Sequence, residues 1–110
     1  MSQIKDKPDI KPFPVQETSA CLLAELTSLA ESELKLQGLT PPDTPGALLT
    51  TKIRLDSLTV VDVTLALEDI LGFEPKNIVQ TGGYDSIQAA LDHMMPRLEA
   101  AWKKNYPAGA

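Results

Sequence analysis

Residues 56–72 read DSLTVVDVTLALEDILG, and this stretch decides the fold of the chain. At roughly 100° per residue, the turn of an α-helix, its apolar side chains fall on two opposite faces. One face has the width that a helix normally buries against its neighbours. We expect it to lie in the core, and its members are Val60, Val63, Leu67, Ile70 and Leu71. The helix should end at Gly72, because Pro75 follows shortly after.

The opposite face of this helix is also apolar, and acidic residues border it. Its apolar members are Leu58, Val61 and Leu65, and its acidic edges carry Asp62, Glu68 and Asp69. A small core does not need a second apolar strip. Such a strip between carboxylates suits a surface that docks briefly on basic partners, with charge steering the approach. The alternative is a solvated acidic face on a leucine-rich helix.

Apolar spacing and turn residues predict the elements before and after this helix. A first long helix is expected over residues 17–37, with Thr18 or Ser19 as its N-cap and Gly38 as its stop. Residues 39–55 contain several prolines, so we expect a crossing loop without a regular helix. One turn of a short helix is expected around residues 77–79.

The last main helix is expected to begin after Asp85, with Gln88 completing a capping box. Pro96 should end or kink it near Met95, because proline lacks an amide donor and collides with the carbonyl of Asp92. No alternation of apolar and polar residues persists long enough to indicate a strand. The expected class is all-α, with three main helices and one short helix.

Length and charge limit the classes of function. The chain has 110 residues and a formal net charge of -5. We predict a disordered tail over residues 1–16, one domain over 17–95, and a helical extension and tail over 96–110. The negative charge argues against nucleic acid, whose binders are rich in Lys and Arg. No apolar run spans a membrane and no secretory signal is visible, so we expect a cytoplasmic protein.

Catalytic chemistry of the chain's own is not expected. Cys21 is the only cysteine and His93 the only histidine, so an internal disulfide, a hydrolytic triad or a multi-histidine metal site lacks parts. No paired acid and base is visible either, and we predict that the protein is not an enzyme. Cys21 should be a small buried or half-buried thiol.

Ser57 begins the two-faced helix, where a serine is ordinarily an N-cap. A phosphate esterified to its hydroxyl would lie at the positive end of the helix dipole, where an exposed anion is favoured by about 0.3 to 1 kcal/mol. The position of the serine alone leaves both uses open.

The run from Asp56-Ser57-Leu58 through Phe73 resembles the acyl carrier proteins. Residues 85–92, DSIQAALD, are similar to the start of that family's last helix. With the long first helix and the proline-containing loop, the likeness covers about residues 17–95. It implies an acyl-carrier-like four-helix bundle.

The resemblance implies that a phosphopantetheinyl transferase uses magnesium to attach the 4'-phosphopantetheine arm of coenzyme A to Ser57. The thiol of the arm would carry an acyl thioester to enzymes of fatty acid, lipid or secondary-metabolite synthesis, such as polyketide synthesis. Its partners would be acyl-activating enzymes, acyltransferases or synthases with basic docking surfaces, and the carrier would be a monomer. Asp56 would assist recognition at the attachment motif. The implied partner face consists of Leu58, Val61, Asp62, Leu65, Glu68 and Asp69.

The chain also departs from this family. Arg54 stands where the family usually has a small residue such as glycine, and Lys52 precedes it. These cations point to an altered choice of transferase or partner, and thus to a specialised carrier. Residues 73–76 are shorter and less acidic than usual. Two alternatives remain: an aminoacyl or peptidyl carrier, and a carrier-like interaction module that never takes the arm.

Overall fold

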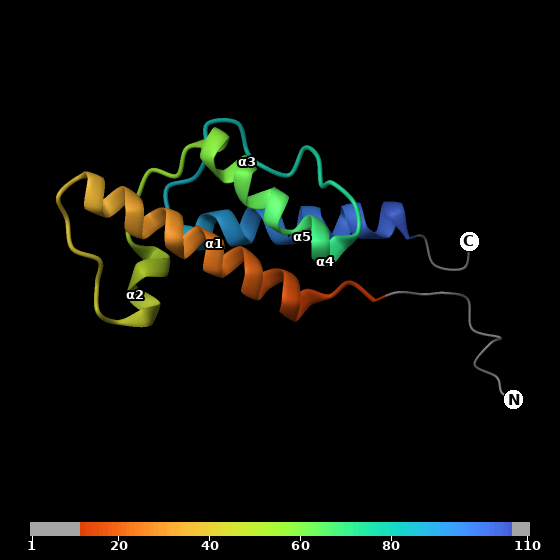
Figure 1. Ribbon diagram of the computed structural model, residues 1–110, viewed down its shortest axis with the longest axis horizontal. Helices are drawn as coiled ribbons and strands as arrows, with labels where there is room; N and C mark the ends of the chain where they lie inside the picture. The colour runs from red at the N-terminus through yellow and green to blue at the C-terminus, as the bar shows by residue number, and fades with distance from the viewer. Residues whose placement is uncertain (1–11, 107–110) are drawn as a thin grey trace, which may run out of the picture.

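The structure is a computed structural model that describes residues 12–106, apart from the side chain of Pro45 (Figure 1). Within these residues the fold is all-α, as predicted, with an isolated antiparallel bridge between Leu55 and Tyr84 and no strand. The predictions for residues 1–11 and 107–110 lie outside the described residues. The helices are α1 (Val15–Leu36), α2 (Pro45–Thr50), α3 (Ser57–Ala66), α4 (Glu68–Leu71) and α5 (Ile87–Asn105).

α1 and α5 lie side by side and run in opposite directions along the long axis of the molecule (Figure 1). α3 packs against α1, and α2 packs against both α1 and α5. The largest fully buried apolar side chains, contributed by all of these helices except α2, are Leu22, Leu26, Val60, Leu67, Leu71, Ile87, Met94 and Leu98. No helix in the described part of the chain has the length and apolar character needed to cross a membrane.

The stretch 56–72 forms α3 and α4, which meet at Leu67. The face predicted for the core is buried, except that Ile70 remains partly exposed. The turn tightens before Leu67: its N–H donates to the carbonyl of Thr64, three residues back, at 3.1 Å, and the Thr64 hydroxyl donates to Val61 at 2.6 Å. Gly72 ends α4 in the left-handed conformation, φ 82°, as its position predicted.

Cys21 contacts the end of α3. Its thiol lies 3.8 Å from the backbone carbonyl of Ala66 and donates a weak hydrogen bond to it. Burial, and then the nearby charge of Glu25, raise the pKa of this thiol. Cys21 is therefore a half-buried protonated thiol that binds α1 to α3, as its position suggested.

α1 begins earlier than predicted, at Val15, and neither Thr18 nor Ser19 caps it. The position before the helix is Pro14, whose carbonyl accepts the N–H of Thr18 at 2.9 Å. Thr18 itself lies inside the helix and is fully buried. The prediction that a glycine stops this helix is confirmed: α1 ends at Leu36, and Gly38 follows in the left-handed conformation with φ 76°.

Two predictions for the connecting segments are wrong. Residues 45–50 form α2, because Pro45 occupies the first helical position, where the missing N–H has no partner to lose. The short helix expected at residues 77–79 does not form. Asn77 has φ 59°, and a left-handed residue interrupts a right-handed helix.

α5 differs from its prediction at its N-terminus. Ser86, not Asp85, is the N-cap, and its hydroxyl accepts the N–H of Ala89 at 3.1 Å. Gln88 makes no capping box; its amide donates to Asp92. The helix also continues through Pro96 to Asn105.

The continuation past Pro96 has a packing reason. Met94, Leu98 and Trp102 recur at helical spacing and are all buried in the same core. Their burial offsets the backbone hydrogen bond that proline cannot make. Leu98 and Trp102 thus pack in the same core as the preceding helices.

Aromatic rings close the end of the bundle where α5 finishes. Trp102 lies 6.1 Å from Phe13, 6.4 Å from Phe73 and 4.4 Å from Tyr106, measured between ring centroids. The Tyr106 hydroxyl donates to the carbonyl of Leu71 at 2.9 Å. These contacts join the start of α1, the end of α4 and the end of α5.

A backbone pairing holds the other end of the bundle. The N–H of Leu55 donates to Tyr84 at 2.8 Å, and that of Tyr84 donates to Leu55 at 2.9 Å. Gly83 makes the pairing possible, because a Cβ there would collide with the carbonyl of Leu55 and lie 3.0 Å from the amide nitrogen of Ser57. Its φ of 82° also favours glycine.

Gly83→Ala is expected to destabilise the protein more than Gly82→Ala. Both glycines have positive φ, so each substitution carries a conformational cost of about 1–3 kcal/mol, but only Gly83 has backbone within 4 Å of the added methyl group. The midpoints of urea unfolding measure the difference. Equal losses in the two variants would contradict the close approach at Gly83.

Candidate functional site

Ser57 is the first residue of α3 and is half-buried. The position before it, where a capping residue stands, is occupied by Asp56, whose exposed side chain makes no capping hydrogen bond. Within the described residues, the Ser57 hydroxyl has no hydrogen-bond partner either. Ser57 is therefore not a helix cap, and its oxygen is free to react.

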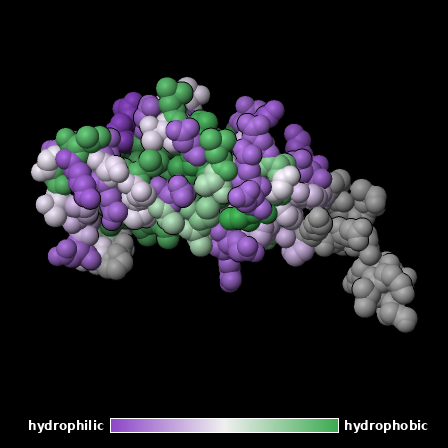
Figure 2. Space-filling model, in the orientation of Figure 1, coloured by the Kyte–Doolittle hydropathy of each residue, from purple (hydrophilic) through white to green (hydrophobic). Residues whose placement is uncertain are grey.

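The second apolar face of the helix lies on the surface. Leu58 is 77% exposed, Val61 46% and Leu65 55%, and we call these residues the apolar strip. Figure 2 shows hydrophobic surface over α3 with polar atoms beside it. Exposed apolar side chains gathered on one helix make this face a candidate contact surface.

Acidic side chains flank the apolar strip without neutralising partners. Asp62 and Asp69 are exposed and Glu68 is half-buried. Among residues 12–106, only Lys103 and Glu99 form an ion pair, so no cation neutralises these carboxylates at contact distance. The strip consequently lies in a negative field.

A groove of about 330 Å³ runs beside the apolar strip. Val61, Thr64 and Leu65 form its α3 wall, and residues 74–79 form the other wall. Sequence reasoning missed this groove because it placed a helix at 77–79, where the chain is a loop.

A second groove, of about 260 Å³, opens on the α1 side of Ser57. We call it the Arg54 groove, and its lining residues are Leu29, Glu33, Arg54, Leu55, Asp56 and Thr59. Arg54 is exposed and forms an ion pair with neither Glu33 nor Asp56, although all three line the groove. Lys52, the other cation noted before Ser57, is exposed but does not line it.

Three polar side chains fix the loop that pairs with the segment before Ser57. The Tyr84 hydroxyl accepts the backbone N–H of Gln80 at 2.8 Å and hydrogen-bonds His93 Nδ1, also at 2.8 Å. The side-chain amide of Gln80 donates to the carbonyl of Gly83 at 3.0 Å. Sequence reasoning gave these residues no role, and its only available sign was the Gly82-Gly83 pair before Tyr84.

The pKa shifts agree with this arrangement. Burial lowers the pKa of His93, and the charge of Arg97 lowers it further. Burial also raises the pKa of Tyr84, against smaller opposing effects of the Gln80 backbone and Arg97. A neutral His93 accepting the Tyr84 proton satisfies both groups, because the Tyr84 oxygen already accepts from Gln80.

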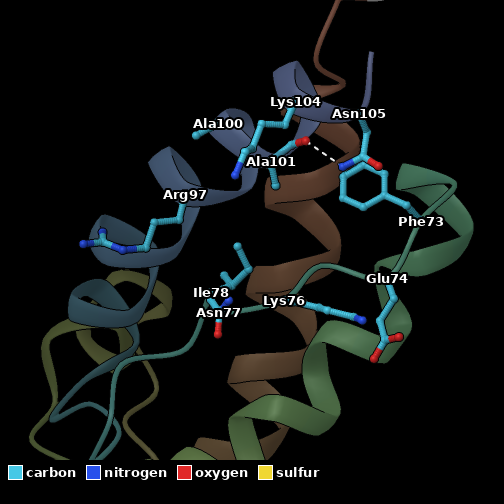
Figure 3. A pocket seen from close by; sticks show the side chains of 10 residues that line it. All are labelled: Phe73, Glu74, Lys76, Asn77, Ile78, Arg97, Ala100, Ala101, Lys104 and Asn105. Atoms are coloured by element: carbon cyan, nitrogen blue, oxygen red, sulfur yellow. Dashed lines mark hydrogen bonds between the residues drawn. The ribbon is translucent and has the colours of Figure 1, made fainter. Parts of the chain in front are cut away.

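A wider cleft, of about 520 Å³, lies at the opposite end of the bundle between residues 73–78 and the second half of α5 (Figure 3). Arg97 points away from this cleft and donates to the carbonyl of His93, and Asn105 donates to Ala101. Its polar side chains do not converge, so we assign it no ligand. No group of three or more metal-ligating side chains occurs in the part of the chain that the structure describes.

No protein-family model matches the chain, and no curated protein or solved structure matches it. The likeness to acyl carrier proteins therefore rests on the sequence features of residues 17–95 described above.

The free energy of unfolding should fall as the pH drops below 6.5, the ordinary pKa of histidine. The folded pKa of His93 is lowered, so the unfolded chain takes up the proton first. The contribution of neutral His93 is complete above pH 6.5 and is lost as the pH falls through the lower folded value.

Urea unfolding at a series of pH values, in the wild type and in His93→Gln, measures this contribution. The variant should show a flatter dependence between pH 6.5 and about pH 5. Identical slopes in that interval would show that His93 contributes nothing.

Proposed function

We propose that this protein is an acyl carrier, loaded on Ser57 with 4'-phosphopantetheine. The observation that carries the proposal is Ser57, a partly exposed residue whose hydroxyl makes no hydrogen bond, at the head of a helix that presents an apolar strip between carboxylates. In a serine that served only as a cap, the hydroxyl oxygen would accept a hydrogen bond from an N–H group of the first turn.

The loading reaction needs only an acceptor oxygen from this chain. A bond forms between Ser57 Oγ and the phosphorus of coenzyme A that bears the pantetheine. The pyrophosphate bond breaks, adenosine bisphosphate leaves, and the hydroxyl proton passes to a base of the separate transferase, which holds the magnesium. The position of Ser57 fits the group, because a phosphodiester there would lie at the N-terminus of α3, where the helix dipole favours an anion.

Once attached, the group supplies a thiol that holds an acyl chain as a thioester. The chain's own residues then bind and deliver. The apolar strip gives contact area to partner enzymes, and Asp62, Glu68 and Asp69 steer basic docking surfaces toward it. In this proposal the chain binds and delivers the acyl group and contributes no catalytic residue.

A second candidate is a carrier-like interaction module that never takes the arm. It is favoured by the loop at residues 73–86, where the carrier family has a short helix. Its apolar strip would dock on a partner whether or not Ser57 carries anything. Partner binding that is unchanged by Ser57→Ala, together with failure to load, would select it.

Loading is expected to add the mass of one phosphopantetheine arm to the wild-type protein. The protein is incubated with coenzyme A and a permissive phosphopantetheinyl transferase, and intact mass is recorded. Ser57→Ala should gain nothing, whereas Ser28→Ala, an exposed helical serine on α1, should load like the wild type. Absence of the adduct with several transferases would remove the carrier proposal.

Charge reversal on the acidic edge should slow the approach of a basic partner. We expect Asp62→Lys to reduce the kcat/KM of loading by roughly tenfold at low salt, with the effect shrinking as salt rises. Glu31→Lys is the matched control, because Glu31 is exposed on the α2 side of α1. Equal effects of the two reversals would show that only net charge matters.

A further inference from the structure

The turn at residues 80–83 is closed by its own hydrogen bonds and joined to the side chain of Tyr84. The N–H of Gly83 donates to the carbonyl of Gln80 at 3.0 Å, and the side-chain amide of Gln80 donates to the carbonyl of Gly83, also at 3.0 Å. The backbone N–H of Gln80 donates to the hydroxyl of Tyr84 at 2.8 Å. These three bonds make the turn and the Tyr84 side chain one unit.

One side of this unit lies against the head of α3. Gly83 is close to the amide nitrogen of Ser57, because a Cβ on Gly83 would lie 3.0 Å from that atom. Two backbone hydrogen bonds join Leu55 to Tyr84, and Asp56 makes no capping hydrogen bond. The backbone that leads into Ser57 is therefore held by the turn and the pairing, and not by a capping side chain.

The other side of the unit ends at His93 of α5. The ring of Tyr84 is buried, and its hydroxyl hydrogen-bonds Nδ1 of His93 at 2.8 Å. Because this hydroxyl already accepts the N–H of Gln80, its own proton is left for His93, and a neutral imidazole accepts it. Contacts thus continue from His93 through Tyr84 and the turn to the backbone of Ser57.

A proton on His93 removes the acceptor that Tyr84 needs. Both nitrogens of an imidazolium are donors, so the Tyr84 hydroxyl would face two N–H groups, and its own proton would have no acceptor. A buried polar group that loses its partner is costly. Protonation of His93 should therefore open its contact with Tyr84.

The neighbouring charges do not stabilise a protonated His93. No carboxylate of α1, of α5 or of the rest of residues 12–106 forms an ion pair with it. α2, which also packs against α5, carries no charged side chain. The charge that acts on His93 is that of Arg97, whose guanidinium donates to the carbonyl of His93 at 2.9 Å and repels an imidazolium.

We propose that Tyr84 and His93 are positioning residues for the loading of Ser57, and that His93 holds the turn against the head of α3 while it is neutral and releases it on taking up a proton. The inference rests on the proposed loading of Ser57. Both residues act through the turn and not on the hydroxyl itself. Because small displacements of a reacting group reduce its rate steeply, loading should slow when the contact opens.

The first test is amide hydrogen exchange at Leu55, whose N–H is in the pairing, in the full chain without the arm. In His93→Gln, a side-chain carbonyl accepts from Tyr84 at every pH. As the pH falls from 6.5 to about 5, exchange in the wild type should become faster than in His93→Gln at the same pH. The ratio should reach about fivefold, which corresponds to one net hydrogen bond. Tyr84→Phe, which cannot make the contact, should exchange fast at every pH.

Dilute urea separates local opening from unfolding of the whole chain, because only unfolding exposes enough surface to respond strongly. Exchange at Leu55 should be insensitive to urea, whereas exchange at Leu26, a fully buried residue of α1, should accelerate. An equal urea response at the two residues would show that the pairing opens only with the whole fold, and would overturn the inference. Equal exchange at Leu55 in the wild type and in His93→Gln at every pH would also overturn it.

The second test measures loading by one phosphopantetheinyl transferase. Dividing kcat/KM for the wild type by kcat/KM for His93→Gln cancels the pH dependence of the transferase itself. This ratio should fall by about fivefold over the same pH interval. A constant ratio, with adducts on both proteins, would overturn the inference and leave the carrier intact. No adduct on either protein would overturn the carrier proposal and the inference with it.

Discussion

The antiparallel pairing of Leu55 with Tyr84 is the contact on which the arrangement around Ser57 depends. It brings the segment before α3 against the segment before α5, so the starts of these two helices lie together. Gly83 allows the backbones to approach, and the Tyr84 hydroxyl anchors the loop to Gln80 and His93. Without this pairing, Ser57 would begin a helix whose N-terminus is held only by the side chains of its core face.

α3 borders three different environments, each on its own side of the helix. One face packs into the core, the apolar strip faces solvent, and the side with Thr59 borders the Arg54 groove. Carboxylates edge the strip, and the groove holds the carboxylates of Glu33 and Asp56 beside the guanidinium of Arg54. A helix with one function besides folding would need only one of these outer surfaces.

The sequence allowed the helical elements with strong periodicity to be predicted, since burial of an apolar face dictates both spacing and structure. The core face of α3 and α4, the exposed strip and the stop at Gly72 follow from residues 56–72 alone. The errors occur where proline and left-handed residues act through tertiary context. Pro45 starts α2. Pro96 lies inside α5, where the burial of Leu98 and Trp102 offsets its cost. Asn77 is left-handed, so the short helix expected at residues 77–79 does not form. The two grooves depend on neighbours that are remote in sequence, and no local pattern reveals them.

The pairing of Leu55 with Tyr84 also orders events during synthesis of the chain. Ser57 leaves the ribosome well before Tyr84, because α4 and the loop of residues 73–83 separate α3 from its anchor. Until that anchor has emerged, the amide of Ser57 has no Gly83 beside it and the head of α3 is not fixed. α5, which follows, must then pack along α1 to complete the core. The surroundings of the serine are therefore assembled by residues made well after it, so its place at the head of α3 is fixed late in folding.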